Sequence, residues 1–126
     1  MAQIFLVDDE EEALAVLVDF LTDLGHNVHT AVDGEKAIEL FSALQPDIVF
    51  LDLYMPKVDG VGVLQKLHEM GIHSEVVVMT GYNDTPHIRR QLEDHPISYF
   101  LEKPLDLLDI ERIVNEIMAR KKNMGL

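Results

Sequence analysis

The stretch IVFLDLYMPKVDG, residues 48–60, determines which fold the chain can adopt. Its first four residues are all apolar, so neither face of a strand built from them would suit water. Such a run is typical of a strand buried between two layers, as in a parallel sheet covered by helices. The run ends on the carboxylate of Asp52, and Met55-Pro56 then interrupts the strand-like pattern. Taken alone, Asp52 is either a solvated strand end or part of a site, because buried aspartates are rare unless paired or metal-bound.

The rest of the chain alternates between strand-like and helix-like patterns. Strands are predicted at residues 4–7, 28–31, 48–51, 76–79 and 99–101, and helices at 11–24, 35–44, 61–70, 85–94 and 106–121. Five such units predict an α/β fold with a parallel sheet and helices on both faces. The first, third and fourth strands are the most apolar and should be central, so the second and fifth should form the edges.

Composition narrows the class of protein. With 126 residues, the chain is expected to form a single domain, residues 1–126. Ten basic against 23 acidic residues give a net charge of −13, so direct nucleic-acid binding is not expected. The chain has no cysteine, no signal-peptide pattern and no apolar run long enough to span a membrane. These features predict a soluble, cytoplasmic protein.

Polar residues able to do chemistry follow four of the predicted strands. They are Asp8-Asp9, Asp52, Thr80 and Lys103. In a parallel sheet the carboxyl ends of the strands meet at one edge, where ligands gather. Clustered carboxylates without cysteine favour a hard cation such as Mg²⁺. A carboxylate can also attack phosphorus and form an aspartyl phosphate, while a hydroxyl and an ammonium group can bind phosphoryl oxygens.

Four motifs give the chain a family resemblance. VDDE, DLYMPKVDG, VVVMTG and YFLEKP occur in this order along the sequence. Together they resemble the response-regulator receiver domain of two-component signalling systems. The resemblance implies a five-stranded flavodoxin-like (βα)5 fold with strand order 2-1-3-4-5. It also implies a cis peptide bond between Lys103 and Pro104, since only X-Pro bonds adopt cis at low cost.

The same resemblance implies a Mg²⁺ site around the phosphoacceptor. Asp52 would accept the phosphoryl group. Asp9 and Asp52 would bind Mg²⁺ through their carboxylates, the backbone carbonyl of Tyr54 would be a third ligand, and Asp8 would act mainly through metal-bound water.

Three further residues acquire roles from the resemblance. Lys103 would bind the phosphoryl group, Thr80 would be the switch hydroxyl and Phe100 the switch aromatic. Without the resemblance, Phe100 would be interpreted as a core aromatic. The run Glu10-Glu11-Glu12 is better explained as a helix start favoured by the helix dipole than as additional metal ligands.

Three functions remain open at this point. The first is a phosphoacceptor module that receives its phosphoryl group from a histidine kinase or histidine phosphotransfer protein and then changes its affinity for a downstream effector. The second is a receiver-like interaction module that is never phosphorylated. The third is a Mg²⁺-dependent phosphohydrolase with an aspartyl nucleophile, in which a second acid usually stands two residues after the nucleophile, where this chain has Tyr54. The first function is favoured, with no enzymatic activity beyond the protein's own phosphorylation and dephosphorylation. Because no effector sequence follows ARKKNMGL, both a stand-alone receiver and part of a larger regulator fit.

Overall fold

A computed structural model describes residues 1–53, 59–81, 90 and 92–123. The strands are β1 (Gln3–Val7), β2 (Asn27–Ala31), β3 (Ile48–Asp52), β4 (Glu75–Thr80) and β5 (Tyr99–Glu102). The helices are α1 (Glu11–Asp23), α2 (Gly34–Ala43), α3 (Gly60–Glu69) and α5 (Leu107–Asn123). The helix predicted at 85–94 lies largely outside the described residues.

The five strands form one parallel sheet in the order β2-β1-β3-β4-β5. The predicted order and both predicted edge strands are therefore confirmed. All five residues of β3 are buried, which explains why its sequence does not alternate between apolar and polar. Its neighbours β1 and β4 are almost as deeply buried, whereas β2 and β5 each expose residues to solvent.

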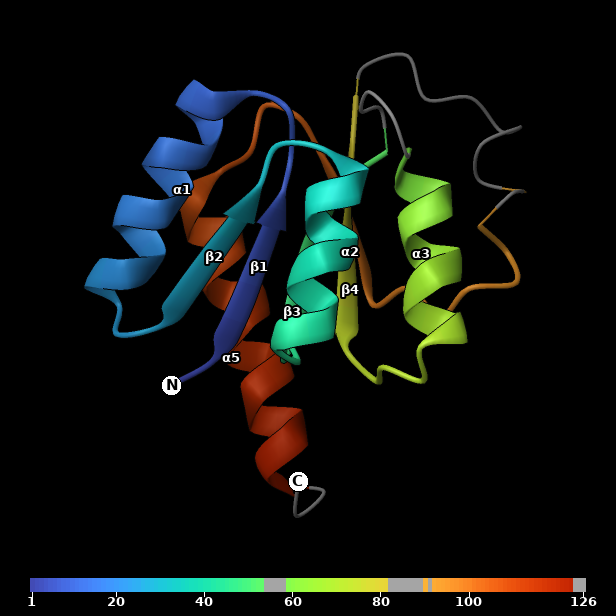
Figure 1. Cartoon of the computed structure of the whole chain (residues 1–126). Helices are drawn as coiled ribbons and strands as arrows, with labels where there is room; N and C mark the ends of the chain where they lie inside the picture. Colours follow the sequence, from blue (N-terminus) through green and yellow to red (C-terminus); the bar gives the residue numbers. More distant parts are fainter. Residues whose placement is uncertain (54–58, 82–89, 91, 124–126) are drawn as a thin grey trace.

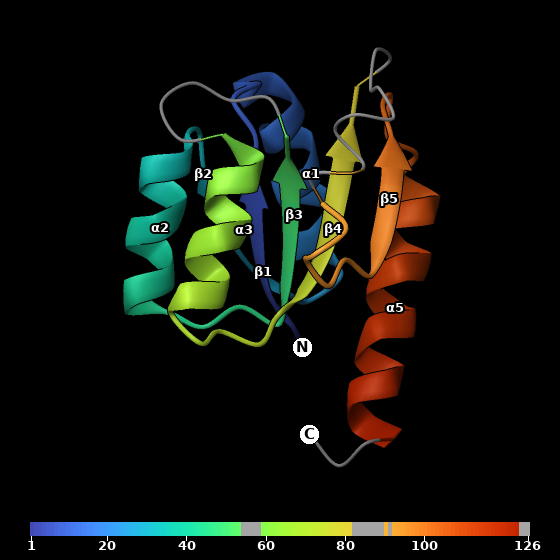
Figure 2. The same cartoon turned by 90° about the vertical axis from the view of Figure 1, so that its right-hand side faces the viewer.

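Helices cover both faces of the sheet, with α1 and α5 on one side and α2 and α3 on the other (Figures 1 and 2). Each layer encloses its own apolar cluster, because successive side chains of a strand point to opposite faces. Along β3, Ile48 and Phe50 face α1 and α5, while Val49 and Leu51 face α2 and α3. This alternation directs the next side chain, Asp52, toward the layer of α1 and α5.

Local signals explain where several helices begin and end. Asp33 and Asp59 precede α2 and α3, and each carboxylate accepts a hydrogen bond from a backbone N–H of the first helical turn at 2.9 Å. The end of α1 is followed by Gly25, whose φ of +93° is one that other residues rarely adopt, so the predicted helix stop is confirmed. These contacts fix where α2 and α3 begin and where α1 ends.

Candidate functional site

The four polar strand ends predicted from the sequence lie at one rim of the sheet. Asp8 and Asp9 follow β1, Asp52 ends β3, Thr80 ends β4, and Lys103 follows β5. Asp8, Asp52 and Thr80 are almost completely buried, with exposed fractions of 1%, 5% and 6%. Buried polar groups of this kind are rare away from partners or ligands, so the rim is a candidate site.

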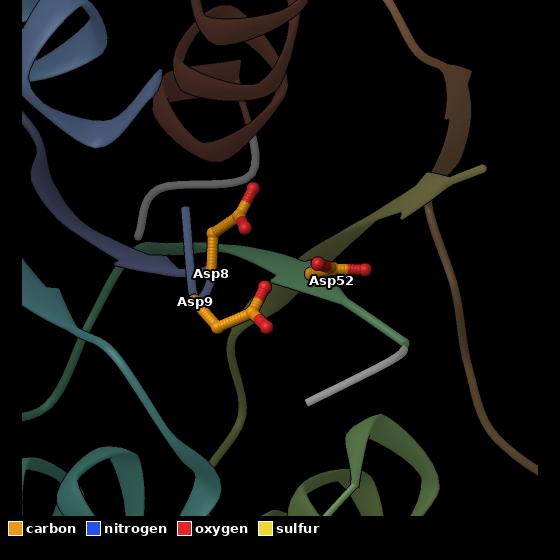
Figure 3. Close-up of side chains that lie close together, drawn as sticks. All are labelled: Asp8, Asp9 and Asp52. Carbon is orange, nitrogen blue, oxygen red and sulfur yellow. The ribbon is translucent and has the colours of Figure 1, made fainter. Parts of the chain in front are cut away.

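Three carboxylates converge at this rim. Asp8, Asp9 and Asp52 each offer an oxygen, and these atoms lie within 4.8 Å of one another. Figure 3 shows Asp8 and Asp9 at the end of β1 beside Asp52 at the end of β3. Asp9 is exposed, so the cluster is open to solvent on one side. Negative charges this close repel each other, and that repulsion favours the arrival of a cation.

Lys103 is the cation that the protein itself supplies. Its Nζ lies 2.9 Å from Asp8 Oδ2, 3.3 Å from Asp52 Oδ2 and 3.6 Å from Glu10 Oε1. Partial burial acts to lower the pKa of Lys103, but the hydrogen bond to Asp8 and the charges of Asp52, Asp8 and Glu10 outweigh burial and raise that pKa. The ammonium group is therefore held in its charged form beside the carboxylates.

Thr80 connects the site to the edge strand. Its Oγ1 donates a hydrogen bond to the backbone oxygen of Leu101 at 3.2 Å, and its own carbonyl accepts from the N–H of Lys103 at 2.9 Å. The Lys103–Pro104 peptide bond is cis, as the resemblance implies. Phe100 is 41% exposed, so the interpretation of this residue as a core aromatic is wrong. By strand alternation it points away from the layer that Leu101 joins.

A glycine brings the start of α3 against the end of β3. An added Cβ at Gly60 would lie 2.6 Å from the Cα of Leu53 and 2.8 Å from the carbonyl oxygen of Asp52. The Gly60 N–H also donates to the Leu53 carbonyl at 3.1 Å. Because any larger residue would force a backbone shift at this contact, Gly60 helps to fix the backbone that carries Asp52.

The donor set suits Mg²⁺. It consists of carboxylate oxygens, which hard cations prefer, and it contains no sulfur or imidazole ligand. Asp8, Asp9 and Asp52 could hold such an ion, with room on the side of Asp9 for water. Tyr54, predicted as a further ligand through its backbone carbonyl, lies outside the described residues. Within the described residues, no other group of three histidine, cysteine or acidic side chains is close enough to bind a metal.

The structure adds Glu10 to the residues predicted from the sequence. Glu10 precedes α1 and its side chain makes no hydrogen bond that caps this helix, whereas Glu11 and Glu12 lie in the first turn as expected. Its carboxylate contacts Lys103 instead. The sequence gives no signal for this contact, because the two residues are far apart in the chain and Glu10 belongs to an ordinary acidic helix start.

Comparison with known proteins identifies the family. A family profile described as the response regulator receiver domain matches residues 4–115. The chain belongs to this family. The receiver fold has solved counterparts, including a response regulator receiver domain from Clostridium thermocellum, with a TM-score of 0.85, 26% identity and coverage of 98% of this chain and 99% of that one. A CheY-like receiver domain from Methylobacillus flagellatus gives a TM-score of 0.81 at 26% identity, covering 93% and 98% of the two chains.

Curated relatives of this chain differ in how much of their own length the match covers. Sporulation initiation phosphotransferase F of Bacillus subtilis is 26% identical over 96% of this chain and 97% of its own length. Regulatory protein AtoC of Escherichia coli is 29% identical over 97% of this chain but only 27% of its own length. The chain spans about half the length of several other curated relatives that it matches. Among the described residues, no helix is both long enough and apolar enough to cross a membrane.

Proposed function

We propose that this receiver is a phosphoacceptor module in which Asp52 is the phosphorylated residue. A carboxylate oxygen of Asp52 attacks the phosphorus of a phosphohistidine on a histidine kinase or histidine phosphotransfer protein. The new O–P bond forms as the P–N bond breaks, and the electron pair leaves with the imidazole nitrogen. The supporting observation is the convergence of Asp8, Asp9 and Asp52 within 4.8 Å, with the Lys103 ammonium 3.3 Å from Asp52.

The residues around Asp52 have distinct tasks in this proposal. Asp8, Asp9 and Asp52 would hold Mg²⁺, and the bound ion would neutralise charge on the carboxylates and the incoming phosphoryl group. Lys103 forms an ion pair with a phosphoryl oxygen. Thr80 turns its hydroxyl from Leu101 toward the phosphoryl group, and Phe100 changes position with it. The transferred group thereby alters the surface beside β5.

The wider role of the protein follows from this change of surface. The change at β5 alters affinity for a downstream effector protein or domain, and the protein catalyses at most its own phosphorylation and dephosphorylation. Residues 1–126 act as one receiver domain in the cytoplasm. Direct contact with nucleic acid is disfavoured by the net charge of −13.

A labelling assay separates this proposal from its alternatives. The wild-type protein is incubated with a small acyl-phosphate donor and Mg²⁺, and the product is followed by intact mass. Stable addition of one phosphoryl group is the expected result. Absence of any addition would support an interaction module that is never phosphorylated, and continuous turnover of added phosphoesters would support a phosphohydrolase. Either of these two results would contradict the proposal.

A further inference from the structure

Lys103 is shared by three carboxylates that differ sharply in their exposure. The side chains of Asp8 and Asp52 are 1% and 7% exposed, whereas the Glu10 side chain is 64% exposed. The ammonium group therefore has two buried partners at the bottom of the site and one partner at its solvent side. Glu10 is outside the carboxylate cluster that could bind a metal.

The backbone and the side chain of Glu10 contact different residues of the site. Its backbone N–H donates to Asp8 Oδ1 at 3.0 Å, which leaves Asp8 Oδ2 to bind the Lys103 ammonium at 2.9 Å. Its side chain, which does not cap α1, lies 3.6 Å from the same ammonium. The backbone of Glu10 thus orients Asp8 while its carboxylate attracts Lys103 toward the mouth of the site.

The Lys103 ammonium contacts Asp8 and Asp52, two of the three carboxylates that could hold a divalent cation. Two cations at these carboxylates would repel each other. A carboxylate that binds the ammonium without binding the metal reduces this conflict. We infer that Glu10 is a positioning residue that holds Lys103 at the solvent side of the site when a divalent cation binds, so that the cation gains Asp52. This inference rests on the proposed Mg²⁺-dependent function.

The inference predicts an effect on Mg²⁺ binding that does not depend on phosphorylation. Glu10→Gln should raise the dissociation constant for Mg²⁺, measured by calorimetric titration, because Lys103 then stays on Asp8 and Asp52. The matched control is Glu11→Gln, which removes the same charge from the next residue. Among the described residues, Lys103 forms ion pairs with Asp8, Glu10 and Asp52 but not with Glu11. We expect Glu10→Gln to weaken binding about two- to fivefold more than Glu11→Gln, the range expected for one partly exposed ion pair.

A double-mutant cycle tests whether Glu10 acts through Lys103. Lys103→Met removes the competing ammonium and should strengthen Mg²⁺ binding. In that background Glu10→Gln and Glu11→Gln should have equal effects, because the contact that distinguishes them is gone. Thermal melting of each variant without metal checks that the fold is retained.

Two results would overturn the inference alone. One is an equal effect of the two glutamine substitutions in the wild-type background, and the other is an excess effect of Glu10→Gln that persists with Lys103→Met. In both cases wild-type Mg²⁺ binding and phosphoryl labelling would leave the proposed function intact. A wild-type protein that neither binds Mg²⁺ nor becomes labelled would instead contradict the proposed function and this inference together.

Discussion

At the scale of single residues, the site depends on buried charges that offset one another. Asp8 and Asp52 are almost inaccessible to water, and two such carboxylates would be costly to bury without partners. Lys103 contacts both and is the partner that the chain provides. One ammonium cannot balance two buried carboxylates together with the adjacent Asp9. The remaining negative charge is what makes the site suitable for a divalent cation.

Thr80 can transmit a change at Asp52 to the edge strand β5, because its hydroxyl contacts this strand. Replacing Thr80 with Val removes the hydroxyl that donates to the Leu101 carbonyl at 3.2 Å. We expect that Thr80→Val can still be phosphorylated. The variant should lose the phosphorylation-dependent change in hydrogen exchange across β5. The measurement compares backbone exchange at equal phosphorylated fractions. Thr80→Ser, which keeps the hydroxyl, is the control and should behave as wild type. A β5 response in Thr80→Val as large as in wild type would contradict the role of the hydroxyl.

At the scale of elements, the position of the site follows from parallel strand pairing. The register places Asp52 opposite Met79 and Thr80 opposite Glu102, so the ends of β3, β4 and β5 reach the same rim. The apolar composition of residues 48–51 and 76–79 was sufficient to predict that these strands are central. Boundaries were less predictable, since β5 extends to Glu102 and α5 continues to Asn123. Strand and helix ends depend on pairing and capping contacts that involve distant residues, such as the bond from the Ser98 N–H to the Val76 carbonyl.

The junction of β3 and α3 makes a sharp prediction about stability. Gly60→Ala would place a Cβ 2.6 Å from the Leu53 Cα, a contact that only a backbone shift can relieve. We expect the free energy of unfolding to fall by roughly 1–3 kcal/mol, the usual cost of overpacking, as measured by urea denaturation. Gly81→Ala is the matched control, because among the described residues an added Cβ there meets nothing within 4 Å. If both variants are equally stable, the close approach at Gly60 is not a constraint on the fold.

At the scale of the whole molecule, the fold was more fully predictable from the sequence than the details of the site. The strand order and the convergence of Asp8, Asp9 and Asp52 agree with the resemblance stated from the motifs, because those motifs sit at strand ends and the topology brings them together. The contact of Glu10 with Lys103 was not predictable, since it depends on the side-chain geometry of residues that are far apart in the chain. The exposure of Phe100 was also unpredicted, because an aromatic residue in a strand is more often buried.

Metal binding should stabilise the whole receiver. A ligand that binds only the folded state raises the free energy of unfolding by about 1.4 kcal/mol when its concentration is ten times the dissociation constant. We therefore expect Mg²⁺ to raise the melting temperature of the wild-type protein by several degrees, and we expect Asp9→Asn to lose most of that increase. Asp19→Asn, which removes an equal charge from an exposed position on α1, should keep it. An equal Mg²⁺ effect in both variants would indicate general charge screening rather than binding at the rim.

The most direct test of the account is the phosphorylation of Asp52 itself. Wild-type protein, Asp52→Asn and Asp19→Asn are incubated with a small acyl-phosphate donor and Mg²⁺, and the mass added to each is measured. The account predicts one phosphoryl group on the wild type and on Asp19→Asn, and none on Asp52→Asn, because an amide is not a competent nucleophile for this transfer. Circular dichroism should show that Asp52→Asn retains the fold. Labelling of Asp52→Asn at the wild-type rate would contradict the account.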